Sequence, residues 1–63
     1  MKTKFIDKIK RKIKSTYENY SLNDSHFFNE GYVNALRDFE IMTYRTWLKC
    51  NKYNEECYKE AAQ

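Results

Sequence analysis

The side chains with the richest chemistry in this sequence are two cysteines and a single histidine, Cys50, Cys57 and His26. A structural zinc site takes four ligands, and its cysteines usually come in pairs about two to four residues apart. The pair Cys50 and Cys57 has six residues between its members, and the histidine is distant in sequence. We therefore expect no metal site, and the chain has no other motif for a cofactor.

The same two cysteines are not expected to form a disulfide. On one helix, residues seven apart are separated by about 10.5 Å along the axis, which exceeds the Cα limit of about 7 Å for a bridge. Seven residues make one heptad, so both thiols are expected on one packed face, as small buried hydrophobic groups.

An enzyme active site is not expected either. A nucleophile needs a base beside it, and His26 is the one histidine in the sequence. No glycine-rich loop is present to hold a phosphate group. The closely spaced acids Asp38 and Glu40, and Glu55 and Glu56, point to different sides of a helix and do not form catalytic pairs. We expect a non-enzymatic protein.

Positive charge is concentrated in the first fourteen residues. They contain seven basic residues and one acidic residue, whereas residues 15–63 contain five basic and eight acidic residues. The stretch KFIDKIKRKIKSTY, residues 4–17, places isoleucine or phenylalanine on every helical turn and basic residues between them. This pattern predicts an amphipathic helix from about Thr3 to Asn19. Its candidate electrostatic residues are Lys4, Lys8, Arg11 and Lys12.

These lysines have three candidate uses. They would steer the chain onto an acidic protein, contact the phosphates of a nucleic acid without reading its sequence, or bind an anionic membrane. We favour the protein partner and keep sequence-independent DNA or RNA binding as the alternative. A membrane is not favoured, because the apolar face lacks tryptophan and is needed to cover another helix.

The composition predicts an all-α fold with a single domain, residues 1–63. Proline is absent and Gly31 is the only glycine, so the sequence lacks the turn residues that several β-hairpins need. Hydrophobic residues make up 41% and aromatic residues 17%, which is too apolar for a disordered tail. No apolar stretch approaches the ~20 residues of a transmembrane helix, and the basic start lacks the apolar run of a signal peptide. We expect a cytoplasmic location. The richness in lysine, asparagine, tyrosine, isoleucine and phenylalanine fits the codons of an AT-rich genome, so the cell is expected to be bacterial or a phage-infected host.

The segment SLNDS, residues 21–25, separates the first helix from a second one. Asn23, Asp24 and Ser25 are all good helix caps, so the second helix is expected to begin near Ser25. From there an apolar stripe continues in phase to Ala61, which predicts a helical hairpin with a second helix of about 37 residues, roughly 55 Å long. The first helix cannot cover this length, so we expect self-association as a homodimer. The alternative is a turn at Asn51–Asn54, which would give a three-helix bundle.

A second apolar face lies opposite the main stripe and includes Val33, Ile41, Tyr44 and Leu48. A two-helix hairpin would leave these residues in water, which indicates a further partner. Large rings on a partly exposed helix face are typical hot spots of protein interfaces. The candidate partner-binding residues are Tyr32, Ile41, Tyr44, Trp47 and Leu48.

The stretch FNEGYVNALRDFE, residues 28–40, resembles a pattern found in small uncharacterised helical proteins of bacteriophages. The pattern has the form G-Y-x-x-A-L followed by an acidic-apolar pair, and here Gly31, Tyr32, Ala35 and Leu36 carry it. The resemblance implies a phage origin and no particular chemistry. From the second apolar face, we expect a small regulator or inhibitor that docks a helix face on a larger protein. In its most specific form it is a phage or mobile-element protein that acts on a host factor.

Overall fold

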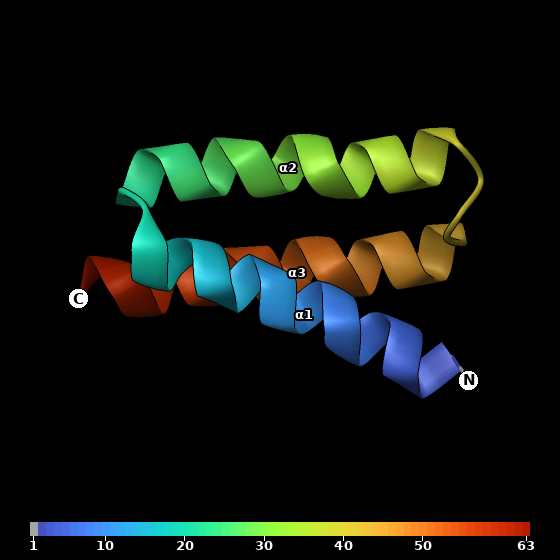
Figure 1. The fold of residues 1–63 in the computed structure, drawn as a ribbon, viewed down its shortest axis with the longest axis horizontal. Helices are drawn as coiled ribbons and strands as arrows, with labels where there is room; N and C mark the ends of the chain where they lie inside the picture. The colour runs from blue at the N-terminus through green and yellow to red at the C-terminus, as the bar shows by residue number, and fades with distance from the viewer. Residues whose placement is uncertain (1) are drawn as a thin grey trace.

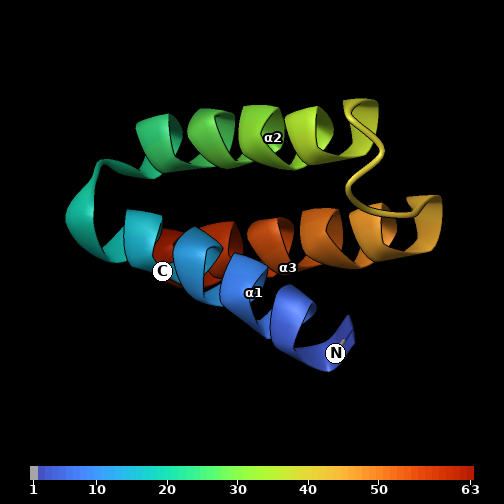
Figure 2. The same ribbon diagram turned by 45° about the vertical axis from the view of Figure 1, so that its right-hand side comes forward.

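The computed structural model describes residues 2–63, with side chains from Phe5 onward. It contains three α-helices, α1 (Lys2–Asn19), α2 (Leu22–Asp38) and α3 (Tyr44–Ala62), and residues 2–63 form no strand. Consecutive helices run in opposite directions, so α1 and α3 begin at the same end of the molecule (Figure 1). Figure 2 shows α2 alongside α3, whereas α1 diverges from α2 towards its own N-terminus. The predicted all-α class is confirmed.

Helix α1 covers nearly the range that its amphipathic pattern predicts. Ile9 and Ile13, one turn apart, are 2% and 0% exposed, whereas Lys8, Arg11 and Lys12 are exposed. Residues spaced by three or four lie on the same face of a helix, so one face packs and the other stays in water. The local pattern was therefore sufficient to define this helix.

The hydrophobic core is small and comes from all three helices and the α2–α3 turn. Its buried apolar residues are Ile9, Ile13, Val33, Met42, Cys50 and Cys57. A chain of this size obtains only about 3–5 kcal/mol of stability from such a core. Among residues 2–63, no helix combines the length and the apolar character that crossing a membrane requires.

Helix α2 begins earlier than the sequence pattern suggested. Its N-cap is Ser21, whose side chain accepts a hydrogen bond from the backbone N–H of Asp24 at 3.2 Å. Asn23 and Asp24 lie inside the first turn, and Ser25 is buried at 1% exposure. Ser25 donates instead to the carbonyl oxygen of Thr16 on α1, at 2.8 Å. Its hydroxyl therefore joins two helices and is not available as a cap.

The predicted long second helix is wrong, because the chain turns between α2 and α3. At the end of α2, Glu40 adopts a left-handed conformation with φ 59°. Its N–H donates to the carbonyl of Arg37 at 2.9 Å, and the N–H of Ile41 donates to that of Leu36 at 2.8 Å. These two bonds form a Schellman motif, which ends a helix. Thr43 then caps α3 by accepting from the N–H of Thr46 at 3.2 Å.

The alternative turn at Asn51–Asn54 is also wrong, because both asparagines lie within α3. Asn54 is only 2% exposed and forms hydrogen bonds with the other two helices. An asparagine is often a turn residue because its amide bonds to its own backbone. Here the amide bonds to distant side chains, which keeps the residue in a regular helix.

The turn also changes which residues of α2 and the turn itself are buried. Val33, expected on the outer face, is fully buried, whereas Phe28 and Phe39 on the expected main stripe are 53% and 78% exposed. α3 folds back along α2, so the long uncovered stripe that motivated a dimer does not exist. A dimer would therefore have to form through side chains that are exposed in this structure.

Candidate functional site

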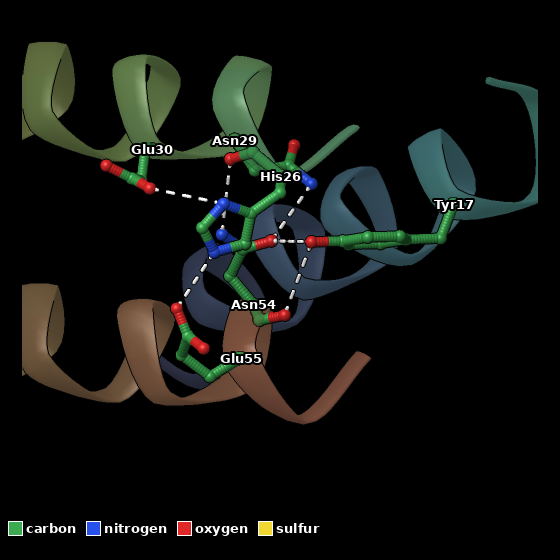
Figure 3. A network of polar contacts seen from close by, with 6 residues as sticks. All are labelled: Tyr17, His26, Asn29, Glu30, Asn54 and Glu55. Carbon is green, nitrogen blue, oxygen red and sulfur yellow. Dashed lines mark hydrogen bonds and ion pairs between the residues drawn. The ribbon is translucent and has the colours of Figure 1, made fainter. Parts of the chain in front are cut away.

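The interior near the α1–α2 turn contains a polar cluster, which we define as Thr16, Tyr17, Ser25, Asn29 and Asn54. The side-chain oxygen of Asn54 on α3 accepts from the hydroxyl of Tyr17 on α1 at 2.6 Å. It also accepts from the amide Nδ2 of Asn29 on α2 at 3.2 Å. Figure 3 shows both groups pointing at this oxygen. One atom therefore connects all three helices.

The rest of the polar cluster connects α1 to α2. Asn29 Nδ2 lies 2.7 Å from Thr16 Oγ1, and this hydroxyl in turn donates to the carbonyl of Ile13 at 2.6 Å. The other side-chain atom of Asn29, Oδ1, is buried and has no hydrogen-bond partner among the described residues. Thr16, Ser25, Asn29 and Asn54 are at most 4% exposed. The hydrogen bonds of these buried groups orient the helices relative to one another.

The hydroxyl of Tyr17 is a stable hydrogen-bond donor. Burial, as the main cause, raises the pKa of Tyr17 to about 12 from its usual value of 10. The amide of Asn29 lowers this pKa in part, but the effect of burial is larger. The side chain therefore acts as a donor near neutral pH and not as a general base.

His26 bridges α2 and α3 on one side of the polar cluster. Its Nδ1 lies 3.2 Å from Glu30 Oε2, and its Nε2 lies 2.9 Å from Glu55 Oε1. Figure 3 shows the ring between the two carboxylates. The ring also meets that of Tyr58 edge-on, with centroids 4.9 Å apart. These contacts place the ring between carboxylates of α2 and α3, so the arrangement joins the two helices.

The two cysteines are buried and free. Burial is the largest cause that raises the pKa of both Cys50 and Cys57. The thiolate is the reactive form of cysteine, so these thiols are poorly suited to nucleophilic chemistry. In the described part of the chain, no three histidine, cysteine or acidic side chains gather in a group able to hold a metal ion.

The clearest feature of the outside is an aromatic surface, which we define as Arg37, Tyr44, Trp47 and Leu48. The guanidinium carbon of Arg37 on α2 lies 4.7 Å from the ring centroids of both Tyr44 and Trp47 on α3. The two rings are stacked with centroids 5.6 Å apart. Trp47 Nε1 donates to Asn34 Oδ1 at 2.8 Å, which fixes the indole. Tyr44 and Leu48, one turn apart, are 56% and 46% exposed.

The structure brings together three of the five predicted partner-binding residues, namely Tyr44, Trp47 and Leu48. Ile41 is 54% exposed, but it lines a groove beside α1. Tyr32 is half-buried and stacks on Phe28 at 6.2 Å. Because Phe28 faces Lys12 of α1, Tyr32 belongs to the α1 side of α2. Tyr32 and Ile41 are thus separated from the aromatic surface.

The predicted electrostatic residues lie along α1. Lys8, Arg11 and Lys12 are exposed. Lys4 belongs to α1, but it precedes Phe5, the first residue whose side chain is described. Lys12 Nζ is 5.8 Å from the ring centroid of Phe28, so this cation partly covers an aromatic ring of α2. Lys8 and Arg11 have no such contact among the described residues.

Sequence reasoning missed Arg37 and Asn34, which hold the aromatic surface in place. Arg37 precedes Tyr44 by seven residues, but the α2–α3 turn lies between them, so helical spacing does not predict their contact. The capping residue Thr43, with Thr46 three residues later, was the local signal for the turn. Once the turn is recognised, α2 and α3 become antiparallel neighbours and the contact follows.

No family model matches this chain, and the searches of curated proteins and of solved structures also found no match.

Proposed function

We propose that this chain is a small non-enzymatic protein-binding regulator or inhibitor that docks its aromatic surface on a larger protein. The observation that carries the proposal is the stack of Arg37 on Tyr44 and Trp47 at the surface. Tryptophan, tyrosine and arginine are the residues most enriched at interface hot spots. Leu48, one turn after Tyr44 on α3, also exposes an apolar side chain to solvent.

The rigidity of the stack supports binding. Trp47 is held by its hydrogen bond to Asn34, and Arg37 is held between α2 and the two rings of α3. Side chains that are already ordered lose less conformational entropy when a partner binds. The free protein thus presents its anchors close to the geometry a complex would use.

The larger protein is, in the most specific version of the proposal, a host factor, and the chain is a phage or mobile-element product. The support is the resemblance of residues 28–40 to bacteriophage proteins. Self-association is the other version, in which a second copy covers the aromatic surface. Light scattering at low and high salt, with reductant present, separates the two, because an apolar dimer persists at high salt.

Photocrosslinking tests the proposed surface directly. A benzoylphenylalanine at position 48 is compared with one at Glu56, which is also exposed on α3. In a lysate of the cells that carry the gene, we expect position 48 to yield one discrete adduct and position 56 to yield none. The adduct should disappear in the Arg37→Ala and Tyr44→Ala variants. Equal labelling from both positions, or an adduct that survives both substitutions, would contradict the proposal.

A second candidate function is sequence-independent binding of DNA or RNA by α1. The observation that favours it is the exposure of Lys8, Arg11 and Lys12 on one helix. Lysines and arginines bind phosphates with an affinity that falls steeply as salt increases. Charge reversal at Lys8 and Arg11 should then abolish binding to duplex DNA, whereas Tyr44→Ala should leave it unchanged. The opposite pattern would favour the protein-binding proposal.

A further inference from the structure

A groove runs between α1 and the N-terminal half of α3, on the side of α3 away from the aromatic surface. It has a volume of about 400 Å³ and an apolar floor of Phe5, Ile6, Ile41 and Met42. Met42 is buried, Phe5 and Ile6 are half-buried, and Ile41 is 54% exposed. An exposed isoleucine that completes an apolar groove indicates a site for a partner's apolar side chain.

The rim of this groove is positively charged. Arg45 and Lys49 line it from α3, and no carboxylate is among the lining residues. Neither cation forms an ion pair with a described residue, since the ion pairs of residues 5–63 all involve His26. Both are exposed and available to a ligand.

The ends of two helices add to this charge. α1 and α3 both begin at this end of the molecule, and neither has an acidic residue in its first turn (Figure 1). Helix N-termini carry a partial positive charge that acidic side chains normally compensate. Arg45 in the first turn of α3 has the unfavourable sign for helix stability, so folding alone does not account for it.

We propose that this groove binds an acidic amphipathic helix of another protein. The partner's apolar residues, spaced by three and four, would lie on Phe5, Ile6 and Ile41. Its carboxylates would meet Arg45 and Lys49, which complements the charge of the rim. This surface is separate from the aromatic surface, so the inference can hold or fail without the proposed function.

A second copy of the chain fits the groove less well. α2 carries three exposed acids, Asp24, Glu30 and Asp38, whose charge would suit the rim, but Glu30 already lies 3.2 Å from His26. The acids are six and eight residues apart, so they do not follow the spacing of three and four that places side chains along one stripe of a helix. Phe27 and Phe28 are the exposed rings between them, and these adjacent residues point in different directions on the helix. A foreign helix with a continuous apolar stripe is therefore the better occupant.

Fluorescence anisotropy with a labelled designed peptide tests the inference. The probe is a helix of about 18 residues with leucines at helical spacing and glutamates elsewhere. The control peptide has the same composition, rearranged so that the leucines share no face. We expect the probe to bind at least about tenfold more tightly than the control, and more weakly as salt increases. Equal binding of the two peptides would overturn the proposal.

Variants of the protein locate the binding site. Ile41→Asp and Lys49→Glu should each weaken probe binding by about tenfold, as expected for a central apolar contact and a rim charge. Lys52→Glu makes the same charge change on α3 outside the groove, and Leu48→Asp alters the aromatic surface; both should stay within about twofold of wild type. Circular dichroism checks that each variant is folded, and Lys49→Glu, at an exposed position, serves if Ile41→Asp unfolds.

Other occupants would give different results. If Ile41→Asp abolishes a dimer that the probe cannot compete with, the groove is a self-association site and the proposal is wrong. If anionic lipid vesicles bind in an Ile41-dependent manner and the probe does not, the groove is a membrane site, and the proposal is again wrong.

Discussion

The two ends of the molecule differ in what they bury. Near the α1–α2 turn, Thr16, Ser25, Asn29 and Asn54 are buried and hydrogen-bonded between helices. Near the α2–α3 turn, exposed hydrophobic side chains are instead the main feature; these are Phe39, Ile41, Tyr44 and Leu48. Exposed rings also occur near the α1–α2 turn, at Tyr20, Phe27 and Phe28, so the buried polar cluster is what distinguishes that end. Polar groups inside and apolar groups outside are both unfavourable in a monomer unless each has another role.

The comparison assigns a different role to each end. Hydrogen bonds in the polar cluster are directional, so they fix how the helices sit relative to one another where apolar packing would accept several arrangements. Ile41, Tyr44 and Leu48 remain about half exposed, so folding buries only part of their apolar surface. The polar cluster therefore helps to orient the helices, whereas the exposed apolar side chains near the α2–α3 turn lie on the surfaces that we propose for partner binding.

Among substitutions in the polar cluster, Asn54→Ala should cause the largest loss of stability. The substitution removes the acceptor of Tyr17 and Asn29 and leaves a small cavity. Leaving buried donors without partners costs about 1–3 kcal/mol each, so we expect a loss of about 2–3 kcal/mol in the free energy of unfolding. Urea denaturation followed by circular dichroism measures it. Asn51→Ala, three residues earlier on α3, is the control and should change stability by less than about 1 kcal/mol.

Tyr17→Phe should cost about 1 kcal/mol at neutral pH, the net value of one hydrogen bond. The pH dependence of this loss of stability is a more specific test of the Tyr17 hydrogen bond. Because the pKa of Tyr17 is raised to about 12 in the folded protein, from 10, its contribution is complete below pH 10 and is lost as pH rises towards 12. Burial likewise raises the pKa of Tyr53, so part of the alkaline decline should persist in the variant. Urea denaturation curves recorded between neutral and alkaline pH give the slope of the free energy of unfolding against pH, for the wild type and for the variant. A decline identical to wild type would rule out the assigned role.

Glu40→Gly should stabilise the protein by about 0.5–1 kcal/mol, because glycine adopts the left-handed conformation without the steric cost of a side chain. This change alters the turn beside the exposed apolar residues and leaves the polar cluster intact. Thermal unfolding provides the measurement. A decrease in the melting temperature would mean that Glu40 makes a stabilising contact that outweighs its backbone strain.

Leu48→Asp should have the smallest effect, within about 0.5 kcal/mol of wild type, since Leu48 is 46% exposed. The matched change Val33→Asp, at a fully buried position, should prevent folding. Denaturation of the purified monomer makes this comparison. A large loss of stability in Leu48→Asp would show that the exposed apolar end contributes to folding and would remove the distinction between the two ends.

Local features of the sequence predicted α1 well. Its range from about Thr3 to Asn19 follows from residues within one helix, and the structure gives Lys2–Asn19. The exposure of Tyr44 and Leu48 also follows from their position opposite the main stripe. The α2–α3 turn was missed, because the left-handed position is occupied by Glu40 and not by glycine, and because the apolar spacing continues across the turn by coincidence.

The sequence alone therefore determined the helical class, the first helix and its charged face, because periodicity acts between residues a few positions apart. The tertiary structure decided where the second helix ends and why Asn54 is buried. It also decided that Arg37 reaches Tyr44 and Trp47, and that Ile41 joins Phe5 and Ile6 in a groove. These features depend on contacts between different helices, and their energies are set by packing and burial that no local pattern contains.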